Sequence, residues 1–79
     1  NDPVANLNAA NSALQRNDTI LAERYLQKAG TSGEAVLARG ILAMLKGDTA
    51  DAEALMRTAQ AMGVTAAAAN LEQVLGAKK

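Results

Sequence analysis

The sequence predicts an all-α fold in which two helical hairpins are followed by a capping helix, all within one small domain of 79 residues. Apolar residues recur every three or four positions, which is the period of a helix with one buried face. Alanine and leucine, which favour helices, are abundant, and Tyr25 is the single aromatic residue. Two turn signals, Asn17-Asp18 and Gly47-Asp48, interrupt the helical pattern at equivalent places.

The segment 38–63 shows the unit of this pattern most clearly: a helix, a tight turn and a second helix. Gly47 can adopt the left-handed conformation that ends a helix. The Asp48 carboxylate can then accept hydrogen bonds from the free N–H groups that begin the next helix, which Gly63 ends. Because the loop is so short, the two helices must pack antiparallel.

Small residues mark where the two helices meet, because missing side chains let their backbones approach closely. We expect Gly40 and Ala43 to face Ala52 and Ala59. The pattern recurs upstream at an offset of 30 residues, so that Gly40, Gly47, Ala52 and Ala59 are preceded by Ala10, Asn17, Ala22 and Ala29. The first repeat is therefore expected at about 3–30, the second at about 33–63 and the capping helix at about 65–76.

Capping residues predict the other helix boundaries. Asp2 is expected to cap the first helix and Pro3 to open it. The second helix should begin after Asp18 and run to about Lys28, and Thr65 should cap the last helix.

The connection between the hairpins, residues 30–34, superficially suggests a phosphate loop. No strand precedes it, however, and it lacks the glycine-lysine-serine or threonine ending that holds a phosphate. Thr31 and Glu34 instead have the spacing of a capping box for the third helix.

The spacing of Gly40, Gly47, Ala52 and Ala59 resembles the tetratricopeptide repeat, in which a small residue of helix A, a turn glycine and two alanines of helix B recur in this order. The Asn-Asp-Pro start is also typical of such repeats. The sequence departs from the family in its period, which is about 34 residues in the family. It also places Arg39 where the family usually has a large apolar residue.

The resemblance implies a short right-handed superhelix in which the first helix of each repeat lines a concave groove for a protein or peptide. Carried over by register, the candidate groove residues are Leu7, Asn11, Leu14, Leu37, Ile41 and Met44. Their largely apolar character predicts either that a hydrophobic peptide binds there, or that the last helix and neighbouring domains cover the groove.

Three features leave more than one interpretation open. Asn6, Asn8 and Asn11 either lie in solvent, or against a preceding repeat, or hold a peptide backbone through their amides. Tyr25 either stacks on a ligand or fills the core with its hydroxyl in water. Arg39 either binds a partner or lies along the apolar surface with its charge in water.

Composition separates the function classes. Eight basic and eight acidic residues give no net charge, which argues against nucleic-acid binding. The chain has no histidine and no cysteine, so we expect no enzyme activity, no metal and no cofactor. We expect no insertion into a membrane, since no apolar stretch is long enough. The start at Asn1, without methionine, suggests part of a longer chain.

A second resemblance concerns the origin of the chain. The stretch NDPVANLNAANSAL and the repeat pattern look like the C-terminal helical segments of some OmpA-like envelope proteins of Gram-negative bacteria. This implies a periplasmic or outer-membrane-associated location. The leading hypothesis is a non-catalytic protein-interaction or scaffolding module, and the alternative is a structural cap or spacer of a larger cell-envelope protein. A third hypothesis is a helical bundle that binds a ligand or forms a homodimer through its alanine-rich face.

Overall fold

The computed structural model describes residues 2–77, which form five α-helices. In chain order these are α1 (Pro3–Gln15), α2 (Thr19–Leu26), α3 (Gly33–Leu45), α4 (Thr49–Ala61) and α5 (Ala66–Ala77). The prediction of an all-α chain is confirmed, and the described residues contain no strand. Residues 1, 78 and 79 of the predicted domain lie outside the described part.

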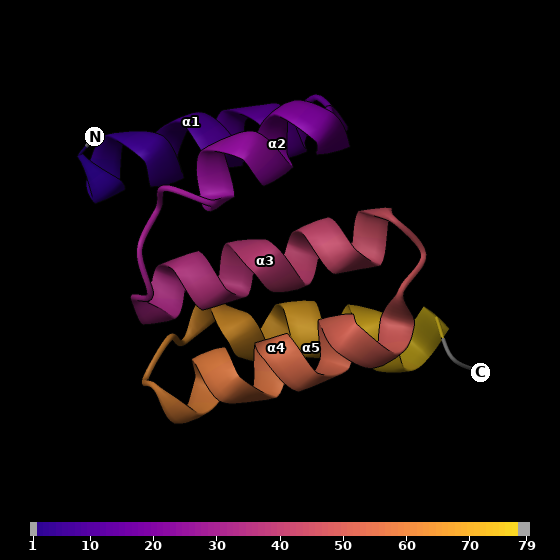
Figure 1. The fold of residues 1–79 in the computed structure, drawn as a ribbon. Coiled ribbons are helices and arrows are strands. Elements are labelled where there is room, and N and C mark those ends of the chain that lie inside the picture. The colour runs from indigo at the N-terminus through magenta and orange to yellow at the C-terminus, as the bar shows by residue number, and fades with distance from the viewer. Residues whose placement is uncertain (1, 78–79) are drawn as a thin grey trace.

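The turns within the hairpins have the predicted chemistry. Asn17 and Gly47 both adopt left-handed backbone angles, with φ of 58° and 84°. The next residue caps the second helix in each case: Asp18 Oδ1 accepts from the Leu21 N–H at 3.1 Å, and Asp48 Oδ1 accepts from the Asp51 N–H at 3.3 Å. The chain therefore reverses twice in the same way, and α1–α2 and α3–α4 are antiparallel pairs (Figure 1).

Two predicted details around the connection are wrong. Helix α2 ends at Leu26 and not near Lys28, because the amides of Lys28 and Ala29 bond to carbonyls only three residues back and tighten the chain into a turn. Ser32, and not Thr31, caps α3, since the Ser32 Oγ accepts at 3.2 Å from the backbone N–H of Ala35, the third residue of the helix.

The start of α3 lies close to the connection between α4 and α5. Gly33 is buried there as the first residue of α3, and a Cβ added to it would lie 2.6 Å from Cγ2 of Val64 and 3.3 Å from Cβ of Met62. No larger residue fits without displacing Val64. Gly33 thus allows α3 to approach the connection after α4, and Ser32, the residue before it, caps the helix.

Helix α3 lies in the middle of the molecule and contacts each of the other four described helices (Figure 1). On one side, Ala35, Ala38 and Leu42 complete a core with the buried residues of α1 and α2; we call this the first cluster. On the other side is the second cluster, whose buried members are Ala52, Met56, Leu71 and Val74 of α4 and α5. Ile41 packs against both clusters and joins them.

The predicted close approach of α3 and α4 at Gly40 is confirmed. A Cβ at Gly40 would lie 3.0 Å from Cγ of Met56, 3.3 Å from Cβ of Leu55 and 3.5 Å from the carbonyl oxygen of Ala52. Ala10, the equivalent of Gly40 in the first hairpin, is fully buried. The small residues thus set the distance between the helices, since a larger side chain would push them apart.

Candidate functional site

Three of the six candidate groove residues come together in a depression between α1 and α3. Asn11 and Leu14 of α1 and Ile41 of α3 line it, and Gln15 completes it, with a volume of about 330 Å³. Gln15 was not predicted as a site residue. It lies one helical turn after Asn11, so its position on the same face could have been found from the sequence.

The depression has an apolar base and polar edges. Leu14 is 6% exposed and Ile41 is half-buried, whereas Asn11 and Gln15 are exposed. Each of these two amides offers a donor and an acceptor, and no charged residue lines the depression. Such a surface can bond a peptide backbone and cover one aliphatic side chain, but it offers no acid, base or nucleophile for catalysis.

The other three candidate residues lie elsewhere. Leu37 and Met44 pack against the second cluster, so α4 and α5 share in covering this side of α3. Leu7 lines a separate, mostly apolar depression of about 250 Å³ with Pro3, Val4 and the connection after α2. The six residues therefore do not form one continuous groove.

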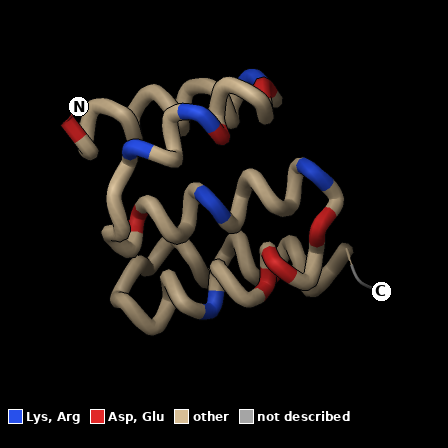
Figure 2. The backbone as a smooth tube through the Cα atoms, viewed as in Figure 1, with Lys and Arg blue, Asp and Glu red and all other residues tan. Residues whose placement is uncertain are grey.

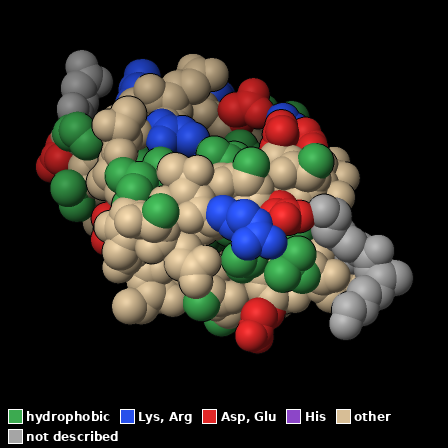
Figure 3. Space-filling view, turned by 90° about the horizontal axis from the view of Figure 1, so that it is seen from below, with side chains coloured by type: hydrophobic (Ala, Val, Ile, Leu, Met, Phe, Trp, Pro, Cys, Tyr) green, Lys and Arg blue, Asp and Glu red, His purple; other side chains and the backbone are tan. Residues whose placement is uncertain are grey.

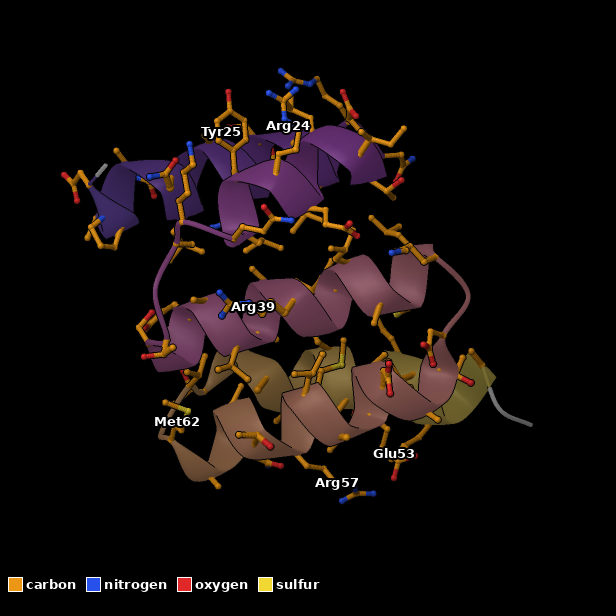
Figure 4. All side chains as sticks on the ribbon, in the orientation of Figure 1. Arg24, Tyr25, Arg39, Glu53, Arg57 and Met62 are labelled. Carbon is orange, nitrogen blue, oxygen red and sulfur yellow. The ribbon has the colours of Figure 1, made fainter. Side chains whose placement is uncertain are left out.

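Arg39 makes a structural hydrogen bond that neither interpretation of the sequence included. Its Nη2 donates to the carbonyl oxygen of Leu26 at 2.7 Å, in a partly buried position between α2 and α3 (Figure 4). The last carbonyls of a helix have no partner within the helix, and a cation is also favourable at that end. Arg39 thus satisfies the end of α2 and ties the first hairpin to α3.

A second, more exposed link joins the hairpins. Lys46 Nζ donates to Glu23 Oε1 at 2.8 Å, and both side chains are half exposed. This hydrogen bond, together with the charge of Glu23, raises the pKa of Lys46. Since exposed ion pairs are screened by solvent, this link should contribute less to stability than the Arg39 hydrogen bond does.

Charged residues elsewhere do not form a recognisable ion site. Blue and red segments are interspersed over the backbone, without an extended stripe of one sign (Figure 2). At the start of α4, a hydrogen bond and the charge of Asp48 raise the pKa of the Asp51 carboxyl. Within residues 2–77, no group of three or more histidine, cysteine, aspartate or glutamate side chains is placed to hold a metal.

The face over α4 and α5 differs from the depression between α1 and α3. Seen from below, its hydrophobic side chains form small patches separated by charged side chains and backbone (Figure 3). Arg57 and Glu53 pair on α4 at 3.0 Å, pointing away from α3 (Figure 4). Among the described helices, none combines the length and apolar character needed to cross a bilayer.

Comparison of the chain with models of known protein families, with curated proteins and with solved structures gave no match in any of the three.

Proposed function

We propose that the chain is a non-catalytic protein-interaction module that binds an extended peptide segment in the depression between α1 and α3. The observation that supports this most directly is the pair of exposed amides, Asn11 and Gln15, beside an apolar base formed by Leu14 and Ile41. The proposal includes a tetratricopeptide-like superhelix. It is supported by the contact between α1 and α3, which are the first helices of the two hairpins.

The expected peptide follows from the chemistry of the depression. Asn11 and Gln15 lie one turn apart on α1, so their amides can meet successive N–H and C=O groups of an extended backbone. Leu14 and Ile41 then cover one aliphatic side chain of the peptide. Because no charge lines the depression, an uncharged segment is preferred.

The experiment begins with a phage-displayed library of random dodecapeptides selected against the chain. A selected peptide is titrated into ¹⁵N-labelled chain, and we expect amide shifts concentrated at Asn11, Leu14, Gln15 and Ile41. The double variant Asn11→Ala/Gln15→Ala should weaken binding about tenfold, because two peptide hydrogen bonds of about 0.5–1.5 kcal/mol each are lost. The exposed Gln73→Ala on α5 is the matched control and should change nothing.

Shifts that fall outside this depression, or a double variant that binds as tightly as the original chain, would refute the proposal. A library without any enriched peptide, together with a well-dispersed spectrum of the folded chain, would favour the second candidate function.

That second candidate is a passive cap or spacer in a larger protein. It is supported by the packing of Leu37 and Met44 against the second cluster, since this part of the predicted groove is covered by the chain itself. A bacterial cell-envelope parent is part of this candidate and derives from the sequence resemblance alone. A full-length gene with a signal peptide would support it, and a cytoplasmic regulator upstream would refute it.

A further inference from the structure

A second groove lies on the opposite side of the first hairpin, between α1 and α2 on the face away from α3. It has a volume of about 300 Å³ and is lined by Asn6, Leu21, Arg24, Tyr25 and Lys28. Tyr25 and Arg24 both project away from α3 (Figure 4). We call this the outer groove; it shares no lining residue with the depression between α1 and α3.

Both charged residues of the outer groove are cations that have no ion-pair partner among residues 2–77. Arg24 lies in the last turn of α2 and Lys28 in the turn that follows it, and neither is in an ion pair with any described residue. The nearest acidic residue in sequence, Glu23, pairs with Lys46 instead. The outer groove therefore presents two free positive charges on one side of a half-buried tyrosine.

Tyr25 supplies the apolar part of this surface. Its ring packs against the first cluster, while its hydroxyl makes no hydrogen bond to another residue of the described chain. The amide of Asn6 is already held by the backbone oxygen of Asp2 at 3.0 Å, which fixes the other wall. A tyrosine with one covered face and a free hydroxyl can both contact an aliphatic chain and donate to an acceptor.

The equivalent positions of the second hairpin show that helix packing does not require these residues. Thirty residues further on, Arg24, Tyr25 and Lys28 are replaced by Ala54, Leu55 and Thr58. The α3–α4 pair packs with these uncharged side chains. Two cations and the single aromatic residue of the chain therefore distinguish the outer groove from an equivalent surface that folds without them.

We infer that the outer groove is a docking site for an acidic segment of a protein partner. Carboxylates of that segment pair with Arg24 and Lys28, and an aliphatic side chain between them lies on the Tyr25 ring. A nucleic acid fits less well, because two cations on a chain of zero net charge neutralise few phosphates. The inference does not depend on the peptide depression between α1 and α3.

Two short capped peptides serve as probes: acetyl-Asp-Glu-Leu-Asp-Glu-amide and its uncharged counterpart, acetyl-Asn-Gln-Leu-Asn-Gln-amide. Each is titrated into ¹⁵N-labelled chain at low and at high salt. We expect the acidic peptide to shift the amides of Asn6, Leu21 and Tyr25 and to bind about tenfold more tightly than the uncharged one, as for two exposed ion pairs. The preference should shrink at high salt.

The decisive variant is Arg24→Ala/Lys28→Thr, which installs the residues of the second hairpin and should fold normally. It is expected to remove the preference for the acidic peptide. The control, Arg16→Ala/Arg57→Ala, changes the net charge equally at exposed positions outside the outer groove and should keep the preference.

Equal binding of the two peptides, absence of binding at millimolar concentration, or an unchanged preference in the decisive variant would each overturn the inference. So would a thymidine decanucleotide that binds the outer groove more tightly than the acidic peptide, since phosphate and not carboxylate would then be its ligand.

Discussion

The two hairpins follow the same local plan but differ in what surrounds them. Each has a left-handed residue at its turn, an aspartate that caps the second helix, and a small residue where the helices meet. The second hairpin is covered on both sides, by the first hairpin and by α5, whereas α3 is the only described helix outside the first hairpin that contacts it. In the first hairpin the second helix has 8 residues, and in the second hairpin it has 13.

The first helices of the two hairpins show the consequence most clearly. Asn8 and Ser12 of α1 are exposed, although the positions 30 residues later in α3 hold Ala38 and Leu42, which are buried against the first hairpin. The same helical position is thus polar where nothing packs on it and apolar where another hairpin does. Residues close in sequence determine the turns, but neighbouring helices determine which residues are buried. We therefore expect the first hairpin to open more readily than the second.

The largest expected effect comes from truncating the equivalent buried residues Met56 and Leu26, which are 0% and 2% exposed. Met56→Ala should cost about 3–5 kcal/mol, and Leu26→Ala about 2–4 kcal/mol, because each leaves a cavity. Met56 shares a cluster with α5 and also contacts α3, so its loss should destabilise the whole chain. Urea unfolding followed by circular dichroism gives both values.

Hydrogen exchange then tests whether the first hairpin opens more readily than the second. Leu26→Ala should accelerate exchange in α1 and α2 while α3, α4 and α5 stay protected, and Met56→Ala should accelerate exchange throughout. Equal acceleration in all five helices by Leu26→Ala would mean that the two hairpins open as one unit and that their different surroundings do not matter.

A smaller effect is expected from separating the hairpins at Arg39. Arg39→Met keeps a long apolar side chain but removes the hydrogen bond to the Leu26 carbonyl, and should lower the free energy of unfolding by about 1–2 kcal/mol. Arg57→Met removes an exposed pair within one helix and should change stability little. Thermal unfolding of both variants checks this. A larger loss for Arg57→Met would show that the α2–α3 bond is not an important link.

The smallest effect concerns the caps and depends on pH. Leu21 stands in the first hairpin where Asp51 stands in the second, and only the second cap therefore places two carboxylates together. Asp48 raises the pKa of Asp51 above its ordinary value of 3.8, so the native state disfavours ionised Asp51. This penalty is present near pH 7 and is relieved as the pH falls through the raised pKa.

The Asp51→Asn variant should accordingly melt slightly above the original chain at pH 7, and the difference should disappear toward acid pH. In an Asp48→Asn background, where an amide can still cap the helix, the same substitution should show no pH-dependent gain. A gain that persists unchanged without Asp48 would mean that the two carboxylates do not interact.

The turns and caps could be predicted because they depend on residues close in sequence. Asn17, Gly47, Asp18 and Asp48 each act on neighbours no more than five residues away. The close approach at Gly40 was also predictable, since the short turn forces α3 onto α4.

What the sequence did not reveal depends on contacts between distant residues. The Arg39 bond joins positions 13 residues apart across two helices, and Gly33 meets Val64 only after α4 has returned along α3. For the same reason, the candidate groove residues lie together only in part. The register placed Asn11, Leu14 and Ile41 together, but the packing of Leu37 and Met44 against the second cluster depends on where α5 lies.

The first cluster has a consequence for how the chain folds during its synthesis. Helices α1 and α2 emerge from the ribosome before Ala35, Ala38 and Leu42 of α3, which complete their core. The roughly 20 residues from the end of α2 to the end of α3 take about 1–4 s at usual rates of translation. During that interval the apolar faces of both helices are open to chaperones and to other nascent chains. Helices α4 and α5, by contrast, are added to a helix that already exists. A ribosome that pauses after α2 has emerged, but before α3 has, would therefore expose the first hairpin while its core is incomplete.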